Sequence, residues 1–426
     1  MDAKKIQEFY LHALYTEAPI SNFISEEEHF FLQHHLSERL NIERAARLRN
    51  LRTVLHDDMH LLNRIFSRAD LLPMVQNFVD LKVSVVQAVR TSLVKGQISA
   101  TTGKGWTLNQ ALCGALGESL ERHCAAYPSV FRPEHRQVPL ASLHGFGHPP
   151  DFTPSEFYFT KELLSNCEYL LPLIEVSFPY HGQDLAKTHV LPHTSGIASG
   201  IDLIEATVFG LLEVIERHAS SNFFQQFKIT PTGALINPSS INDTHFRFVL
   251  NELEEHGYDS FIFRIDAILP TYYVAILDTA NLGPKFMVSG VSTHFDEREA
   301  LDGALLEALQ AIVIAAQGAR EDLKRHAASY KNQSIGNDNP FYRIQKILAE
   351  FNPSQCAPTT KANLPASANE ALELLLSRLH GAGIHSIYQC DLSQPQWPLC
   401  VAKIIVPGRF DTHINPLRKN NVTTST

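Results

Sequence analysis

The sequence has no stretch that approaches the roughly 18 consecutive apolar residues with which a helix crosses a membrane. Its start is not the apolar run and small-residue cleavage site of a signal peptide. An excess of basic over acidic residues is also missing. The formal net charge is −9 and the isoelectric point is near 6.2, which gives no electrostatic footprint for nucleic acid or an anionic membrane. These absences predict a cytoplasmic protein that binds neither membrane nor nucleic acid.

Cysteine is scarce, and several catalytic signatures do not occur. The six cysteines have no CxxC spacing, so we expect them to be reduced packing residues. The sequence has no Gly-x-Ser-x-Gly elbow and no Rossmann glycine fingerprint. The stretch Gly103-Lys104-Gly105 lacks the spacer and the following Ser or Thr of a Walker A loop, so we expect a loop that is not a Walker A. Hydrolase and dehydrogenase activities therefore have little support.

What the sequence does contain is one short pattern in three copies. Each copy has a capping residue, Gln or Glu three residues later, then Ala, then Glu seven residues after the alanine and Glu or Gln three further. The copies are Thr107–Glu121, Asp202–Glu216 and Asp296–Gln310. Thr or Asp followed at the third position by Gln or Glu is a capping box, so each copy predicts the start of a helix.

The acidic pairs in these three predicted helices indicate a cation site. Their pairs are Glu118 with Glu121, Glu213 with Glu216, and Glu307 with Gln310. Side chains three apart on a helix are neighbours, and carboxylates there repel unless a cation or donor lies between them. One such pair is usually a solvated surface, but the apolar flanks and the recurrence argue against chance. Because Mg²⁺ typically takes a few carboxylates plus substrate phosphates, the pattern predicts a Mg-nucleotide site.

Stretches rich in β-branched and aromatic residues predict strands between the helices. The predicted strands are Leu81–Val89, Ile262–Ile265, Tyr272–Leu277, Phe286–Val291 and Cys400–Val406. Strands and helices therefore mix along the chain, which indicates an α/β protein.

At these motifs the chain resembles the YcaO family of ATP-dependent enzymes that modify peptide backbones. The matching segments, in family order and spacing, are Thr101–Thr107, Ala115–Arg122, Ser195–Gly200, Glu205–Arg217, Glu307–Gln310 and Gln317–Asp322. The resemblance implies an α/β (α+β) fold: a YcaO-type domain with mixed sheets and acidic ATP- and Mg-binding helices. We expect this domain at residues 58–426, after a short helical extension at residues 1–57.

The resemblance also implies the cofactors, ATP and Mg²⁺, and the residues that bind them. The nucleotide would be surrounded by Glu118, Glu121, Glu205, Glu213, Glu216, Arg217, Glu307, Gln310 and Lys104, and the metal would be bound by Glu118, Glu121, Glu213, Glu216 and Glu307. Arg217 would contact phosphate oxygens, which suit a forked guanidinium. No residue is identified as catalytic.

Three positions depart from the family pattern. Gly114 stands where the family often has Ser, Ile201 where it often has a polar residue such as Asn, and Ile312 where it has Arg. Each change removes a polar contact to the nucleotide, so either a neighbour such as Ser199 substitutes or the nucleotide binds less tightly. The intact carboxylates argue against a full loss of binding.

The family attaches a nucleophile to a backbone carbonyl and phosphorylates the amide oxygen, so that phosphate departs. The resemblance thus implies ATP- and Mg-dependent formation of an azoline, a thioamide or an amidine in a ribosomally synthesised peptide or protein. The alternative is a non-catalytic or accessory YcaO-like protein that acts with partners, for example in ribosomal protein methylthiolation. Ile201 and Ile312 favour the alternative, and the intact acids favour the enzyme.

A separate partner protein is expected to deliver the substrate. Azoline-forming members commonly end in Pro-x-Pro-x-Pro, whereas this sequence ends in Asn-Asn-Val-Thr-Thr-Ser-Thr, and no leader-binding or E1-like domain is expected ahead of the motifs. The partner would be TfuA-like for a thioamide-forming member and E1-like or ocin-ThiF-like for an azoline-forming one. The helical extension is compatible with a homodimer.

Overall fold

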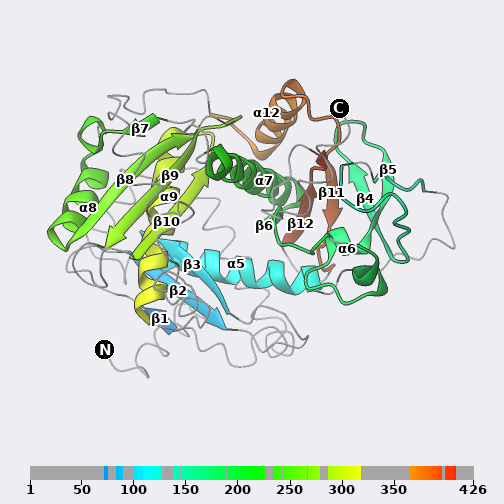
Figure 1. Ribbon diagram of the computed structural model, residues 1–426, viewed down its shortest axis with the longest axis horizontal. Helices are drawn as coiled ribbons and strands as arrows, with labels where there is room; N and C mark the ends of the chain where they lie inside the picture. The colour runs from blue at the N-terminus through cyan, green and yellow to red at the C-terminus, as the bar shows by residue number, and fades with distance from the viewer. Residues whose placement is uncertain are drawn as a thin grey trace. The chain divides into compact units, whose positions relative to one another are not determined.

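The structure is a computed structural model of the chain (Figure 1). It describes residues 72–74, 83–89, 100–106, 108–126, 128, 138–143, 145–188, 190–226, 234–241, 243–265, 267–278, 286–317, 364–395 and 399–408. The extension expected at residues 1–57 and its boundary lie outside the described residues, so both stay predictions. Among the described residues, no helix is both long and apolar enough to cross a membrane.

The chain forms two compact units. Unit 1 comprises the described residues of 1–75, 84–214 and 367–426, and unit 2 those of 76–83 and 215–366. Helix α7 (Leu203–Gln226) is continuous and contributes its first part to unit 1 and its second part to unit 2.

Unit 1 is built on two antiparallel sheets. Along the three-stranded sheet the order is β1 (Leu72–Met74), β2 (Ser84–Val89), β3 (Ala100–Gly105); along the five-stranded sheet it is β5 (Glu168–Pro172), β4 (Phe157–Glu162), β11 (Tyr388–Asp391), β12 (Cys400–Ile405), β6 (Ile197–Gly200). The helical segments are α5 (Leu108–Ala126), α6 (Leu173–Val176), η3 (Gln183–Lys187), α12 (Ala368–Gly381) and the first part of α7. Helix α5 packs on β2 and β3 and also contacts β6, so it joins the two sheets.

Unit 2 is one antiparallel sheet with helices packed on it. The strand order is β10 (Phe286–Thr293), β9 (Thr271–Asp278), β8 (Tyr258–Ile265), β7 (Ala234–Ile236). Helix α9 (Glu297–Gln317) packs on β10 and β9, and α8 (Thr244–Glu255), which follows η4 (Pro238–Ser240), packs on β8 (Figure 1). The mixed α/β fold class predicted from the sequence is confirmed.

The three predicted helices begin where their capping boxes place them. Helices α5, α7 and α9 start at residues 108, 203 and 297, each one residue after the predicted cap. In α7 the Glu205 amide donates to Asp202 Oδ1 at 2.7 Å, and in α9 the Arg298 amide donates to Asp296 Oδ1 at 2.8 Å. Thr107 lies outside the described residues. Local cap chemistry therefore fixes where the acidic pairs fall.

The predicted strands correspond to β2, β8, β9, β10 and β12. One local expectation was wrong: Gly103-Lys104-Gly105 is not a loop but the end of β3, paired with β2. Glycine is unfavourable in strands because it has no side chain to pack, unless another backbone approaches closely. Here α5 lies against the strand, and this contact outweighs the local preference.

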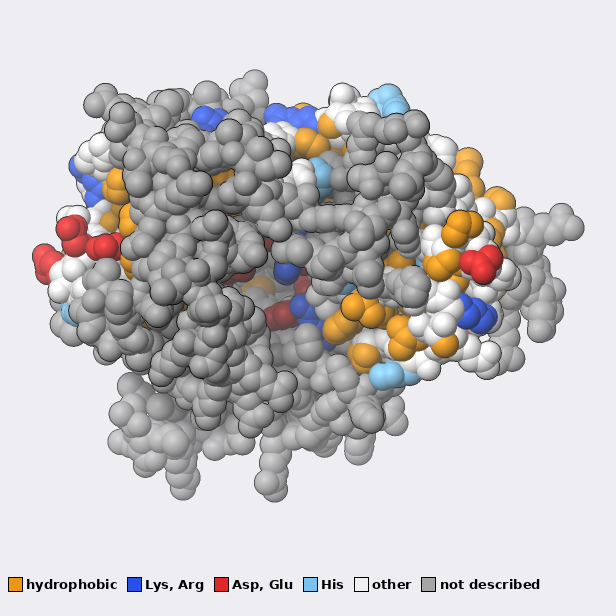
Figure 2. Space-filling view, in the orientation of Figure 1, with side chains coloured by type: hydrophobic (Ala, Val, Ile, Leu, Met, Phe, Trp, Pro, Cys, Tyr) orange, Lys and Arg blue, Asp and Glu red, His pale blue; other side chains and the backbone are white. Residues whose placement is uncertain are grey.

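Unit 1 leaves some large apolar side chains at its surface. Leu140, Leu185 and Leu191 are 44%, 41% and 55% exposed. Figure 2 shows hydrophobic side chains mixed with charged ones on the side of the molecule that carries β4, β5 and α6. Scattered exposed leucines are normal on protein surfaces, so we assign no function to them.

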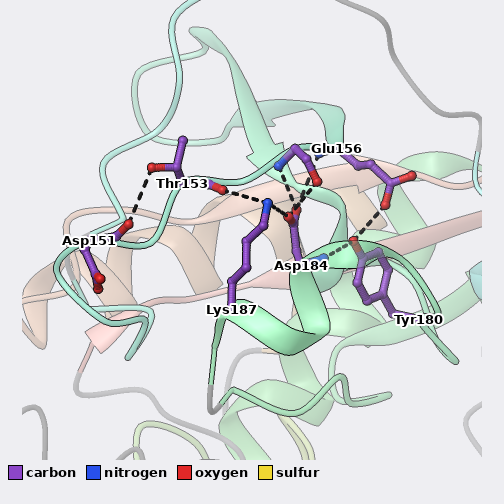
Figure 3. Close-up of polar contacts among 7 residues, drawn as sticks. Asp151, Thr153, Glu156, Tyr180, Asp184 and Lys187 are labelled. Atoms are coloured by element: carbon purple, nitrogen blue, oxygen red, sulfur yellow. Dashed lines mark hydrogen bonds and ion pairs between the residues drawn. The ribbon is translucent and has the colours of Figure 1, made fainter.

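A buried carboxylate ties η3 to the segment that enters β4 (Figure 3). Asp184 is fully buried and accepts hydrogen bonds from the Ser155 amide at 2.8 Å, from Ser155 Oγ at 2.6 Å and from Lys187 Nζ at 2.8 Å. Beside it, Tyr180 Oη donates to Glu156 Oε2 at 2.7 Å. The carboxylate thus satisfies loop donors that would otherwise be buried without acceptors.

We expect Asp184→Asn to lower the free energy of unfolding at neutral pH by about 2–4 kcal/mol, because an amide cannot accept all of these bonds. Burial alone would raise the pKa of Asp184, but the hydrogen bonds from Lys187 and Ser155 outweigh it, and the pKa is lowered from 3.8. A carboxylate whose pKa is lowered in the folded state stabilises the fold at pH values above its unfolded-state pKa. This stabilisation is lost as the pH falls through the folded-state pKa. The loss on mutation should therefore shrink in acid. Urea unfolding measures the free energy of unfolding of each protein. The control is Asp151→Asn, which changes an exposed carboxylate nearby and should have no effect on this free energy.

Candidate functional site

Two carboxylates near the end of α5 are held by surrounding groups of unit 1. Glu118 Oε2 accepts a hydrogen bond from the Thr102 amide of β3 at 3.1 Å, and its Oε1 accepts one from Arg122 Nη2 at 2.8 Å. Glu121 Oε1 accepts two bonds from Ser199 of β6, from the amide and from Oγ, both at 2.8 Å. Each carboxylate of the first predicted pair is thus anchored by a different strand.

Like charges gather around Glu121. Burial raises its pKa from 4.5 to about 7, against the lowering effects of Arg122 and the Ser199 hydrogen bond, while the charges of Glu118 and Glu213 raise it further. The structure therefore brings Glu118, Glu121 and Glu213, on α5 and α7, into one electrostatic group. A buried carboxylate of raised pKa is a recognised mark of a functional site.

Glu121→Gln is expected to stabilise the nucleotide-free protein above neutral pH. Because the pKa of Glu121 is higher in the folded than in the unfolded state, the proton on Glu121 stabilises the fold. This stabilisation is lost as the pH rises through about 7. Glutamine mimics the neutral acid at every pH. The melting temperature of the variant should exceed that of the wild type by a few degrees at about pH 8 and by much less at about pH 5.5. An equal difference in melting temperature at both pH values would contradict the raised pKa of Glu121.

The third copy repeats the first in unit 2. Glu307 Oε2 of α9 accepts a hydrogen bond from the Val291 amide of β10 at 2.9 Å. The sequence separation of Glu307 from Val291 is 16 residues, equal to that of Glu118 from Thr102. Two strand–helix pairs thus hold their acidic residue in the same way.

The anchoring of each carboxylate by a strand amide depends on close contact between the strand and the helix. A Cβ added to Gly103 would lie 1.8 Å from the carbonyl oxygen of Ala111 in α5, and one added to Gly290 would lie 2.1 Å from that of Ala304 in α9. No side chain fits at either position. The glycines let each strand lie directly on its helix, so that a strand amide reaches the helix carboxylate.

Glu205 has a local role at the start of α7. It is buried, its amide donates to the Asp202 cap, and its Oε2 accepts a hydrogen bond from the Ile201 amide at 2.6 Å. The bond to Asp202 is that of a capping box, and the bond back from Glu205 reaches Ile201, one residue before the cap. The position of Ile201 therefore contributes a backbone donor to Glu205, whatever its side chain.

The remaining predicted residues lie on three elements. Glu216 and Arg217 are on α7, where Arg217 is exposed, and Gln310 is on α9, one turn beyond Glu307. Lys104 is on β3 between two glycines that face α5. Because strand side chains alternate between faces, the Lys104 side chain points to the other face of the sheet, away from α5.

Two of the three departures from the family pattern have a packing role. A Cβ on Gly114 would lie 3.3 Å from the Cα of Gly103, so a larger residue would crowd the crossing of α5 and β3. Ile312 is 3% exposed, and it belongs to the apolar core of α9 rather than to a polar surface.

Sequence reasoning missed the groups that hold the carboxylates. The donors from Thr102 and Val291 are backbone amides, which leave no side-chain signal. The available signals were the glycines of β3 and β10, which mark a close approach of two backbones. Ser199 was considered only as a substitute for a lost nucleotide contact, whereas the structure places it against Glu121.

The carboxylates of each unit suit a magnesium nucleotide. The oxygens of Glu118 and Glu121 in unit 1, and those of Glu307 in unit 2, are hard ligands of the kind Mg²⁺ prefers, and Mg²⁺ is usually bound by one or two carboxylates together with phosphates. Among the described residues, no group of three or more acidic, histidine or cysteine side chains is arranged so that it could hold a metal ion without other ligands such as phosphates.

A family model described as YcaO cyclodehydratase, binding ATP and Mg²⁺, matches residues 102–409. The chain belongs to the YcaO family. The matched segment contains all of the predicted site residues, and the resemblance inferred from the motifs is confirmed. ATP and Mg²⁺ are accordingly the cofactors of this YcaO protein, and ATP-dependent cyclodehydration is its activity at the level of the family.

Relatives of this YcaO protein are distant. An uncharacterized protein of Methanothermobacter thermautotrophicus is 25% identical over 352 residues, which is 79% of this chain and 88% of the relative. A Mycobacterium tuberculosis protein, Rv1375, is 25% identical over 53% of this chain, which spans about half (49%) of that relative. A protein of Rhizobium leguminosarum bv. trifolii, described as lying in the tfuA 3′ region, is 23% identical over 58% of this chain and 59% of the relative.

Solved structures share the fold. YcaO from Methanopyrus kandleri, bound with AMPPCP and Mg²⁺, has a TM-score of 0.62 at 20% identity and covers 84% of this chain and 90% of its own. The Escherichia coli microcin synthetase McbBCD complex with pro-MccB17 bound has a TM-score of 0.51 at 15% identity, covering 79% of this chain and 91% of its own.

Proposed function

We propose that this YcaO protein uses the acidic residues of α5, α7 and α9 to bind ATP and Mg²⁺, and activates a backbone amide of a peptide or protein. The observation that carries the proposal is the repeated anchoring of Glu118 and Glu307 by strand amides. A carboxylate anchored by a strand amide is held in a defined position, as a metal ligand must be, and in Glu118 the second oxygen also accepts a hydrogen bond from Arg122.

In this proposal the residues of the site hold Mg²⁺ and ATP in position and balance their charges. Glu118, Glu121, Glu213, Glu216 and Glu307 bind the metal, and Glu205, Arg217 and Gln310 belong to the nucleotide site. Lys104, on the face of β3 away from α5, is left out of this proposal. Bound Mg·ATP supplies the γ-phosphoryl group and the charge that stabilises its transfer. With Mg·ATP bound, a nucleophile would add to the amide carbon and the amide oxygen would take the phosphoryl group. Phosphate would then leave with that oxygen, and the nitrogen or the added nucleophile would lose a proton as the new double bond forms. ADP and phosphate are the co-products.

The substrate class is a ribosomally synthesised peptide or a protein, and the product is an azoline, a thioamide or an amidine according to the nucleophile. Support comes from the microcin synthetase neighbour, which was solved with pro-MccB17 bound, and from the Rhizobium relative named for the tfuA region. We propose a TfuA-like protein as the first partner to test, with an E1-like or ocin-ThiF-like protein as the second.

The second candidate function is that of an accessory YcaO protein that binds nucleotide without turning it over. The buried position of Ile312 favours it, because the arginine of the family pattern is replaced by a core residue. The two candidates share the nucleotide site and differ in turnover.

Phosphate release distinguishes them. The purified protein with Mg²⁺ and ATP is assayed alone, with a TfuA-like partner, and with that partner plus a peptide substrate. The enzyme predicts release that depends on the peptide and a matching change in peptide mass. Binding of AMPPCP without release in any mixture would support the accessory function, and no binding of AMPPCP would contradict both.

A further inference from the structure

A lysine lies inside the core of unit 1. Lys403 is in the middle of β12 and has no exposed surface. Its neighbours in register are Cys390 of β11 and Ile197 of β6. Because side chains alternate along a strand, Lys403 shares a face with Val401 and Ile405, which belong to the apolar cluster that also contains residues of α5. Burial of an ammonium group is costly, whereas an apolar side chain of this length would fill the position without that cost.

The ammonium group reaches the turn that leads into β6. Lys403 Nζ donates to the backbone oxygen of His193 at 2.6 Å, and the next residue of β12, Ile404, donates its amide to the backbone oxygen of Gly196 at 2.8 Å. Within the turn, the Ile197 amide donates to the Thr194 oxygen at 3.1 Å. Two successive residues of β12 therefore hold the two sides of one turn.

The turn itself has little freedom. Gly196 has a φ of +80°, in the left-handed region that favours glycine, and a Cβ there would lie 2.2 Å from the backbone oxygen of Ile404. Ser195 beside it is buried. A fixed turn of this kind sets where the following strand begins.

The strand that follows the turn, with the residue after it, carries three donors to the candidate site. Ser199, three residues after Gly196, binds Glu121 through its amide and its hydroxyl, and the amide of Ile201 binds Glu205. The path from Lys403 through residues 193–196 to these carboxylates lies wholly in unit 1.

We propose that Lys403 is a positioning residue for the nucleotide site: it holds the 193–196 turn so that Ser199 and Ile201 present their donors to Glu121 and Glu205. The inference rests on the proposed function, because it assigns those carboxylates to the Mg-nucleotide site. Lys403 itself does not contact the nucleotide. Its effect passes through the backbone of β6.

The test is Lys403→Met, which keeps the length of the side chain and removes the charge and the donor. The melting temperature of the nucleotide-free variant is expected to equal or exceed that of the wild type within about 2 °C, since the apolar replacement avoids the desolvation cost. Its affinity for Mg·AMPPCP by calorimetry is expected to fall at least about tenfold. Hydrogen exchange at the amides of Ser199 and Ile201 is expected to become faster in the free protein.

Lys161→Met is the matched control, because Lys161 is an exposed lysine of β4 in the same sheet and should change none of the three measurements. A lower melting temperature with unchanged affinity, or failure of Lys403→Met to fold, would make the lysine a structural residue and overturn the inference. Wild-type protein that does not bind Mg·AMPPCP would instead overturn the proposed function. Normal wild-type binding with unchanged binding and exchange in Lys403→Met would overturn the positioning role alone.

Discussion

Glu118→Gln and Glu307→Gln are each expected to lower the affinity for Mg·AMPPCP by at least about a hundredfold, or ~3 kcal/mol. Glutamine keeps an oxygen for the strand amide of Thr102 or Val291, so the side chain can stay on its strand, although Glu118→Gln also loses the ion pair with Arg122. What it loses is the charge that a hard cation requires. The equal geometry of the two anchors predicts losses of similar size in the two units.

Calorimetry with Mg·AMPPCP measures the loss, and the melting temperature of each variant shows whether the fold is intact. Glu254→Gln, at an exposed carboxylate of α8, is the control and should bind like the wild type. If both site variants keep affinities within about twofold of the control, the metal-binding role of these carboxylates is wrong.

Gly103→Ala and Gly290→Ala are expected to cost at least about 3 kcal/mol of stability each, or to prevent folding. The single added carbon would lie 1.8 Å and 2.1 Å from helix carbonyl oxygens, far inside van der Waals contact. The clash is with backbone, which has no rotamer to change. Relief requires that the strand leave the helix, and that would also withdraw the amide from the carboxylate.

Soluble yield and calorimetric melting measure this effect. Gly381→Ala in α12 is the control, because a Cβ there meets nothing within 4 Å, and alanine should stabilise the helix by about 0.5–1 kcal/mol. Variants at Gly103 and Gly290 that melt like the wild type would show that the strands do not cross their helices at these contacts.

The helices of the site could be predicted because their signals are local. A capping box needs only four consecutive residues, so Asp202 and Asp296 predicted the starts of α7 and α9 to the residue. The spacing from each cap then fixed where the acids fall on the helix. The family pattern added the cofactors, ATP and Mg²⁺.

The anchors could not be predicted, because they join distant residues through the backbone. Nothing in the identity of Val291 indicates that its amide holds Glu307, and Lys403 is separated from its acceptor at His193 by 210 residues. The end of β3 was misread for the same reason. Glycine is a turn signal locally, and only the presence of α5 makes it a strand residue.

The position of β12 has a consequence for how the protein is made. Strand β6 pairs only with β12 among the described strands, and β12 begins at Cys400, some 200 residues later in the chain. A ribosome must therefore synthesise some 200 further residues before β6 gains this neighbour and the turn that precedes it gains Lys403. Until then Ser199 has no fixed place from which to hold Glu121. The nascent chain should thus acquire affinity for nucleotide only after β12 has left the exit tunnel.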